Sequence, residues 1–305
     1  MKLSIIIPVY NVHNSLRRCV ESILSMDLSD YEIVLIDDGS TDGSSQLCDE
    51  LEASTTRIRV IHQPHHGLSA ARNTGLKKTH SEYITFVDSD DYLSPDTFPK
   101  LMAILRVHTE YDILEFPAII AQGSPHQHRL TLTKKEYSDV KEYWLNGHAY
   151  EHAYAWNKIY RRELFNGVRF PEGKTFEDVY TLPLVLERAQ MVATTSQGLY
   201  IYCYNGKGIT ANASSNELSD LLDAHRIYIE KYTDKADWQT KEFSVYFAHV
   251  LNILLDSGEN DSFWKEIASN VQPVTLKTFL MKSFGINFLS KTNTLWHKIV
   301  PRKRS

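Results

Sequence analysis

Aspartates follow two short apolar runs in the first third of the chain. Asp37 and Asp38 come directly after one run, and Asp88 and Asp90 come directly after another. Carboxylates two residues apart at the end of a strand can reach a divalent cation that carries a nucleotide diphosphate. Two acidic clusters at one edge repel each other unless a cation or the hydroxyl groups of a sugar lie between them. The acids therefore predict a site for a cation, a sugar or both.

The apolar runs recur at intervals of 25 to 28 residues and are rich in β-branched side chains. Segments whose apolar residues have helical spacing separate them, which predicts strand–helix–strand units. Such units form a parallel sheet buried on both faces, and ligands bind beyond the carboxyl ends of its strands. The four predicted strands are Leu3–Ile7, Tyr31–Ile36, Ile58–Ile61 and Tyr83–Val87.

Beyond residue 100 the pattern is looser, and helices dominate from about Glu217 onward. The expected helices cover residues 95–107, 140–145, 179–189, 220–232 and 242–255. The expected strands cover residues 112–116, 157–160, 191–195 and 199–204, and a polar stretch covers 122–129.

Composition excludes several classes of protein. The 305 residues are 42% hydrophobic and 23% charged, which excludes collagen-like, low-complexity and wholly disordered chains. A net charge of −5 argues against a general attraction to nucleic acid. Three distant cysteines indicate neither a disulfide framework nor a thiolate zinc site. Because no run approaches the ~20 apolar residues of a membrane span and no signal peptide is apparent, we expect a cytoplasmic protein.

Charge is unevenly distributed along the chain. From Ile267 to Ser305 there are seven Lys or Arg residues and no acid. Aromatic and apolar residues lie among these lysines, so the tail could lie on an anionic membrane surface at the inner face of the plasma membrane, near lipid-linked acceptors. An ordinary helical cap with a solvated end explains the same pattern. The sequence leaves both interpretations open.

The loop after the first predicted strand excludes two nucleotide-binding folds. Dinucleotide-binding proteins and P-loop NTPases both need glycines there, but residues 10–15 contain none. A protein with acids where those folds have glycines is expected to contact a diphosphate through a metal rather than through backbone amides alone.

Four segments in chain order resemble the signatures of family 2 inverting glycosyltransferases with the GT-A fold: Ile5–Asn11, Asp37–Asp42, Gly67–Gly75 and Phe86–Asp91. Two later segments, Ala155–Arg162 and Phe176–Tyr180, resemble the acceptor-side segment and the Glu-Asp pair of that family. The resemblance covers roughly residues 1 to 210.

The resemblance implies an α/β fold, a GT-A-like and Rossmann-related sandwich with a mainly parallel sheet and a C-terminal helical extension. Residues 1–215 would form the glycosyltransferase domain, with a nucleotide-binding half (1–100) and an acceptor half (101–215). Residues 216–305 would form a helical region that ends in the basic tail.

The resemblance also implies donor-binding roles for ten residues. They are Pro8, Val9, Tyr10, Asn11, Asp38, Arg72, Asp88, Ser89, Asp90 and Lys207. Tyr10 is expected to pack near the base of the nucleotide, Asp38 to contact uracil or ribose, and Arg72 to support the acidic loops. Asp90 is expected to be the single protein ligand of a Mn²⁺ or Mg²⁺ ion. Lys207 is expected to replace an arginine that relatives often have, and His65 stands where an asparagine is usual.

Several of these residues also have plainer interpretations. Tyr10 could be a core residue, Asn11 a turn residue and Arg72 a structural ion-pair partner. Asp90 or Asp91 could cap the following helix, and for Asp91 capping is the favoured interpretation.

An inverting transfer needs a carboxylate within hydrogen-bond reach of the attacking acceptor hydroxyl. The resemblance places this base at the Glu-Asp pair, with Asp178 as the first choice and Glu177 as the second. Acids are also common in the first turn of a helix, where they interact favourably with its dipole. The resemblance further implies acceptor contacts for Trp156, Asn157 and Lys158.

Together these patterns predict a metal-dependent hexosyl- or N-acetylhexosaminyl-transferase. Its donor is a nucleotide-diphosphate sugar, with UDP favoured, and its acceptor is a saccharide or a lipid-linked saccharide. The resemblance implies a role in bacterial capsule, exopolysaccharide or lipopolysaccharide synthesis. Two alternatives remain: a non-catalytic nucleotide-sugar-binding subunit, and a nucleotidyltransferase.

Overall fold

The computed structural model describes residues 2–206, 208, 213–259 and 261–285. The chain divides into two compact units, which we call the sheet unit and the helical unit. The sheet unit consists of Met1–Val140, Tyr154–Gly173 and Thr181–Asn205. The helical unit consists of Lys141–Ala153, Lys174–Tyr180 and the chain from Gly206 onward. The helical unit thus includes two segments that precede the C-terminal helices in the sequence.

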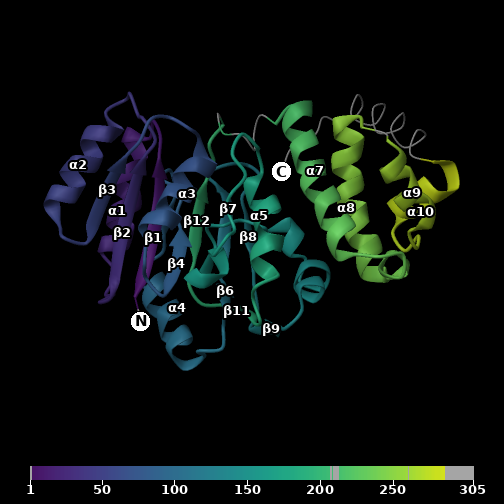
Figure 1. Cartoon of the computed structure of the whole chain (residues 1–305), viewed down its shortest axis with the longest axis horizontal. Helices are drawn as coiled ribbons and strands as arrows, with labels where there is room; N and C mark the ends of the chain where they lie inside the picture. The colour runs from purple at the N-terminus through teal and green to yellow at the C-terminus, as the bar shows by residue number, and fades with distance from the viewer. Residues whose placement is uncertain (1, 207, 209–212, 260, 286–305) are drawn as a thin grey trace. The chain divides into compact units, whose positions relative to one another are not determined.

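A mixed sheet is the centre of the sheet unit (Figure 1). In the part of the chain that the structure describes, eight strands form it in the order β3-β2-β1-β4-β10-β6-β11-β9. The first four in sequence run parallel, with β1 between β2 and β4, and β3 beside β2. They are β1 (Leu3–Val9), β2 (Tyr31–Asp37), β3 (Ile58–His62) and β4 (Tyr83–Phe86). The four strands predicted from the apolar runs are therefore confirmed.

The second half of this sheet is mostly antiparallel. Strand β10 (Lys158–Arg161) lies antiparallel between β4 and β6 (Ile113–Glu115). Strand β11 (Val192–Thr194) is parallel to β6, and β9 (Lys135–Tyr137) pairs with it antiparallel. The strands expected around residues 112–116, 157–160 and 191–195 are confirmed. Strand β9 was not expected, because three residues give no detectable alternation.

A second sheet has the order β5-β12-β7-β8 among the described strands. Its members are β5 (Tyr92–Leu93), β12 (Tyr200–Cys203), β7 (Ala118–Gln122) and β8 (His128–Leu130). Only β12 was expected. The polar stretch from residue 122 to 129 links β7 to β8, which pair antiparallel. β5 and β8 have only two and three residues, and the apolar run of β7 is four residues long, so these strands give a weaker pattern than the parallel strands.

Helices cover both faces of the parallel half of the main sheet. Ile5 and Ile7 of β1 share a buried cluster with α1 (His13–Leu24) and α2 (Ser44–Ser54). The side chain of Ile6 points to the other face and meets Gly75 of α3 (Leu68–Lys78). Burial on both faces is why β1 is apolar except for Ser4.

The helix expected over residues 95–107 is confirmed as α4 (Thr97–Val107), and that over 179–189 as α5 (Glu177–Leu186). The expected helix at 140–145 is instead a short π-helical turn over Glu142–Asn146. In the helical unit, the side chains of Trp144 and Tyr150 pack with Tyr228 and Tyr246. This aromatic packing joins the turn to the C-terminal helices.

Four C-terminal helices follow in the described part of the helical unit, and each begins at a hydroxyl or carboxylate side chain that accepts a backbone N–H. These helices are α7 (Ser215–Tyr232), α8 (Lys241–Ser257), α9 (Ser262–Asn270) and α10 (Leu276–Phe284). The expected C-terminal helical extension is confirmed. Within the described residues, no helix combines the length and apolar composition that a membrane crossing requires. Most of the basic tail, residues 286–305, lies outside the described residues.

Gly75 provides the first test of this packing. A Cβ atom at residue 75 would overlap Ile6 Cγ2 in the central strand β1, where both side chain and backbone are buried. We expect Gly75→Ala to lower the free energy of unfolding by about 1–3 kcal/mol, because overpacking outweighs the better helix propensity of alanine. Urea unfolding measures this, with the exposed Lys78→Ala in the same helix as the control. Equal stability of the two variants would contradict the tight α3–β1 contact.

Candidate functional site

The ends of β1, β2 and β4 bring the predicted donor residues to one edge of the main sheet. These three strands are parallel neighbours, so their carboxyl ends lie together. Pro8 and Val9 are buried residues of β1 itself and shape the strand end. Tyr10 and Asn11 follow β1, Asp38 follows β2, and the segment from Asp88 to Asp91 follows β4.

Asp38 is almost completely buried and organises the loop before α3. One carboxylate oxygen accepts hydrogen bonds from Gln63 Nε2 (2.6 Å) and from the backbone N–H of His66 (3.0 Å). The other accepts the backbone N–H of Gly67 (2.7 Å) and lies 2.8 Å from His65 Nδ1. Both oxygens therefore have partners within the protein. A direct contact between Asp38 and uracil or ribose stays a prediction.

Tyr10 is not a core residue, because 45% of it is exposed. Its ring stacks on His65, with 4.0 Å between the ring centroids and 18° between the planes. His65 is itself held by Asp38. The chain thus forms an aromatic platform of Tyr10 and His65 at the strand ends, at the position where the resemblance would lead one to expect an asparagine.

Asn11 is a turn residue with φ of +54°, a value that asparagine tolerates better than most residues. Its Oδ1 accepts the backbone N–H of Thr41 (2.8 Å), and its own N–H donates to Ser40 Oγ (3.2 Å). Asn11 therefore ties the loop after β1 to the loop after β2. This confirms the turn interpretation, and its contact with a nucleotide stays a prediction.

Arg72 projects from α3 into the interior and is 1% exposed. Its Nη2 donates to Asp88 Oδ1 over 2.9 Å, and its guanidinium lies 5.3 Å from the centre of the Phe170 ring. The counter-charge compensates the burial of the guanidinium, and the ring adds a cation–π contact. The pair fixes the first acid of the segment after β4. It fits both support of the acidic loops and a structural ion pair, and a role of Arg72 in donor binding stays a prediction.

Asp90 is partly buried beside a second carboxylate. Burial, and then the neighbouring Asp88, raise the pKa of Asp90 above its usual range. Its Oδ2 accepts a hydrogen bond from Asn205 Nδ2 (3.3 Å), and its backbone carbonyl accepts one from Arg18 Nη2 (2.5 Å). Ser89, between the two acids, is buried.

Asp91 does not cap a helix, which corrects the favoured interpretation of this residue. Helix α4 begins only at Thr97, whereas Asp91 is fully buried and bonds to β12. Its carboxylate accepts the hydroxyl of Tyr200 (2.9 Å) and the backbone N–H of Cys203 (2.7 Å). Burial raises the pKa of Asp91 well above its usual range, and Asp88 adds to the shift. Asp91 therefore anchors the acidic segment to the second sheet.

The residue types at this edge suit a divalent cation whose other ligands are phosphate and water. Asp88 and Asp90 offer hard carboxylate oxygens two residues apart, and a cation beside them would offset the burial and the repulsion from Asp88 that raise the pKa of Asp90. No group of three or more His, Cys, Asp or Glu in the described residues is arranged to hold a metal. Mg²⁺ and Mn²⁺ need only one or two carboxylates when phosphate and water complete the shell.

The three predicted acceptor residues lie in the interior of the sheet unit. Trp156 is stacked between Tyr154 (4.5 Å) and Tyr200 (4.3 Å). The side chains of Asn157 and Lys158 are fully buried, and Lys158 Nζ lies 3.0 Å from Glu115 Oε1. We call this set of buried, mutually contacting residues the buried frame. Contact of the three residues with an acceptor stays a prediction.

Glu177 and Asp178 stand in the first turn of α5, the position that the alternative interpretation gave them. Glu177 is buried, Asp178 is partly exposed, and the preceding Phe176 has φ of +54°. Within the helical unit, Asp220 of α7 holds the approach to this turn by accepting Lys174 Nζ (2.7 Å) and the backbone N–H of Thr175 (3.0 Å).

Lys207 lies outside the described residues. Tyr200 and Asn205 were not among the predicted site residues, although they contact the acidic segment from more than 100 residues away. Tyr200 lies in the predicted strand at 199–204 and Asn205 follows it, but nothing local indicates which loop they would meet.

Residues 4–169 match the family described as Glycosyl transferase family 2, which is more than half of the chain. The chain belongs to glycosyl transferase family 2. Glycosyltransferase GlyA of Streptococcus pneumoniae is 32% identical to this chain over 312 residues. The alignment covers 95% of this chain and 42% of GlyA. Uncharacterized glycosyltransferase EpsJ of Bacillus subtilis is 36% identical over 68% of the chain and 62% of EpsJ. The chain thus spans only part of the length of these relatives.

The family 2 chain shares its fold with solved structures. The crystal structure of S. aureus TarS 1–349 superposes with a TM-score of 0.71 over 98% of this chain and 92% of that chain, at 19% identity. The mannosyltransferase PcManGT of Pyrobaculum calidifontis gives a TM-score of 0.59 at 14% identity, over 97% of this chain and 88% of that chain. The predicted α/β fold with a mainly parallel sheet and C-terminal helices is therefore confirmed.

A histidine at the end of β3 gives this family 2 chain a pH-dependent contact. His62 Nδ1 lies 2.8 Å from Asp37 Oδ2, and this hydrogen bond raises the pKa of His62 despite partial burial. The stabilisation that this contact gives to the folded state is therefore fully present below the pKa of His62 in the unfolded chain, about 6.5. It is lost as pH rises through the higher pKa of His62 in the folded chain.

We expect the stability difference between wild type and His62→Gln to be largest near pH 6 and to shrink as pH rises toward about 8.5. Urea unfolding at several pH values measures it, with the exposed His80→Gln as the control. His62 Nε2 also lies 2.9 Å from Asp49 Oδ1, so a difference that does not change with pH would contradict a charged His62 between Asp37 and Asp49.

Proposed function

We propose that the chain is an inverting glycosyltransferase that transfers a sugar from a nucleotide diphosphate, with UDP favoured, to a saccharide or lipid-linked saccharide. The observation that carries this proposal is the acidic segment after β4, held by Arg72 and by β12 in a chain of family 2. TarS has been solved in complex with UDP-GlcNAc and with UDP, which supports a UDP-sugar as the donor.

Relatives support a role in the synthesis of surface polysaccharide or teichoic acid. One is the minor teichoic acid biosynthesis protein GgaA of Bacillus subtilis, 31% identical over 65% of this chain and 46% of GgaA. If the acceptor is carried on lipid, the basic tail would hold the chain at the anionic membrane surface that carries it. The proposed division keeps every donor-binding residue except Lys207 in 1–100 and the acceptor-binding residues in 101–215.

On the donor side, the platform of Tyr10 and His65 offers a stacking surface for a base, and Asn11 shapes its rim. Asp90, with Asp88 beside it, would hold Mn²⁺ or Mg²⁺. PcManGT has been solved with GDP-Man and Mn²⁺, which supports a metal at a related site. The metal, when bound, would neutralise negative charge that develops on the leaving diphosphate. Lys207 would add a further positive charge.

On the acceptor side, Asp178 would accept the proton of the attacking hydroxyl, with Glu177 as the second choice. An inverting reaction needs this base on the face opposite the leaving group. The hydrogen bonds of Asp220 to Lys174 and Thr175 fix the turn that carries the two acids, so their backbone is already ordered.

Donor binding is tested by thermal unfolding with nucleotide diphosphates and their sugars, with and without Mn²⁺. A ligand at about 100 times its dissociation constant adds about 2.7 kcal/mol, which moves the midpoint by several degrees. We expect a Mn²⁺-dependent shift with one UDP-sugar, lost in Asp90→Asn and retained in Asp96→Asn, an exposed acid nearby. If no nucleotide or nucleotide sugar shifts the unfolding midpoint of the wild type, the proposed donor site is contradicted.

The base is tested by the turnover of Asp178→Asn. We expect a loss of about 10²–10⁴-fold in transfer with an unchanged donor-induced thermal shift, because the proton acceptor is lost and the donor site is not. Glu242→Gln, an exposed acid in the first turn of α8, is the matched control. Full activity of Asp178→Asn would transfer the role to Glu177. A wild type that binds donor without transfer or hydrolysis would favour a non-catalytic binding subunit.

A further inference from the structure

The sheet unit contains a small pocket of about 200 Å³ whose charged side chains are all basic. Its walls come from the last turns of α3 and from the 3₁₀ turn η3 (Arg162–Phe165) and the loop after it. The lining residues are Leu76, Lys77, Arg162, Phe165, Asn166 and Arg169. None of them belongs to the predicted donor, acceptor or catalytic residues.

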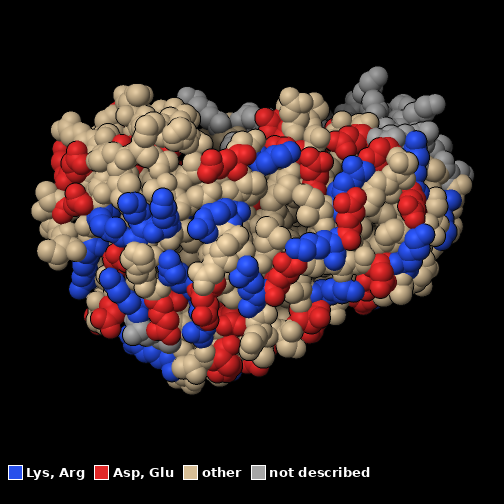
Figure 2. All heavy atoms as spheres, viewed as in Figure 1, with Lys and Arg blue, Asp and Glu red and all other residues tan. Residues whose placement is uncertain are grey.

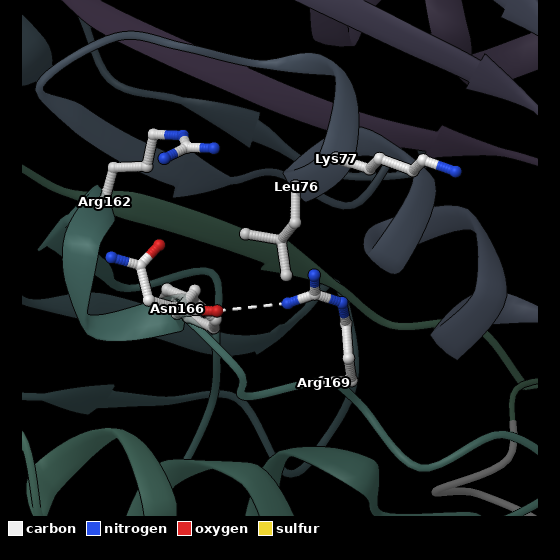
Figure 3. Close-up of a pocket in the computed structure, with 6 residues that line it drawn as sticks. Leu76, Lys77, Arg162, Asn166 and Arg169 are labelled. Carbon is white, nitrogen blue, oxygen red and sulfur yellow. Dashed lines mark hydrogen bonds between the residues drawn. The ribbon is translucent and has the colours of Figure 1, made fainter.

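The two arginines of this pocket are held in place through backbone carbonyls. Arg162 Nε donates to the carbonyl of Thr79 (2.8 Å). Arg169 Nη1 donates to the carbonyls of Phe165 (3.0 Å) and Val168 (2.6 Å). Each guanidinium is therefore oriented through one nitrogen, and its other nitrogens remain to donate. Figure 3 shows the two guanidinium groups on either side of Leu76, with Asn166 beside them.

The positive charge of the pocket is not balanced within the protein. In the part of the chain that the structure describes, neither Arg162 nor Arg169 lies within 4.0 Å of a carboxylate, and no acid lines the pocket. The adjacent Arg161, by contrast, pairs with Asp112 (3.0 Å) and Glu82 (3.6 Å). Three basic side chains around one hollow, with no acid among its lining residues, suit an external anion.

The basic region extends beyond the pocket. A wider hollow of about 590 Å³ shares Lys77 and Arg169 with it and continues along α3 past Asn73 to His66. Glu172 is the acid that lines this second hollow. Lys and Arg gather around α3 on the face shown in Figure 2. In Figure 3 the Lys77 ammonium points away from the two arginines, so it stands at the rim where the hollows meet.

We propose that the pocket between Arg162 and Arg169 binds a phosphate group of a ligand other than the sugar donor. The planar, oriented forks of two arginines match the oxygens of a phosphate, and Asn166 adds an amide donor at the same wall. The phosphate comes either from a soluble phosphate compound or from the headgroup of a lipid. Neither source depends on the proposed transferase activity.

The test measures binding of pyrophosphate to the full chain by calorimetry at low salt, with a chelator present so that no divalent cation supports the donor site. We expect binding to weaken at least tenfold in Arg162→Gln/Arg169→Gln. It should be unchanged in Arg106→Gln/Arg129→Gln, which removes the same charge from exposed positions elsewhere in the sheet unit. Screening should weaken wild-type binding as salt is raised. Equal binding by both double variants, or none by the wild type, would overturn the proposal.

Two further measurements complete the test. Arg162→Lys/Arg169→Lys keeps the charge and loses the forked geometry, so we expect intermediate affinity; it also replaces the glutamine variant if that variant does not fold. Co-sedimentation with vesicles of phosphatidic acid in phosphatidylcholine, against phosphatidylcholine alone, separates the sources. Vesicle binding that is lost in the glutamine variant and competed by pyrophosphate assigns the pocket to a lipid phosphate. Pyrophosphate binding without vesicle binding assigns it to a soluble one.

Discussion

The burial of carboxylates at the ends of β2 and β4 is the constraint on which the rest of the site depends. A carboxylate removed from water costs several kcal/mol unless charges or hydrogen-bond donors replace its solvent. Asp38 obtains those donors from the loop before α3, and Asp91 obtains them from β12. Arg72 supplies the counter-charge for Asp88. Each buried acid thereby fixes a segment that is distant in the sequence, and together these segments form the edge.

Tyr200 connects this edge to the interior. Its hydroxyl accepts the backbone N–H of Asp88 and donates to Asp91, and its ring stacks on Trp156. Trp156 is followed by the buried pair of Asn157 and Lys158, which meets Glu115 of β6. Packing in this frame therefore determines where the acidic segment can lie.

Conformational and electrostatic effects act together at the proposed base. The positive φ of Phe176 and the hydrogen bonds of Asp220 fix the turn before α5. The first turn of a helix then stabilises the negative charge of the acids that it carries. A structural preference for acids in this turn and a role for Asp178 in proton transfer are therefore compatible, because the same turn that stabilises the carboxylate leaves Asp178 partly exposed.

The sequence by itself determined the four parallel strands, the positions of the acids after them and the C-terminal helices, because apolar periodicity is a local property of the chain. Only the tertiary structure decided that Asp91 bonds to β12 rather than capping a helix, that Asn157 and Lys158 are buried, and that Tyr10 stacks on His65. Those outcomes depend on partners between about 40 and 110 residues away. A buried polar group takes whichever donor the fold brings to it, and no local pattern encodes that partner.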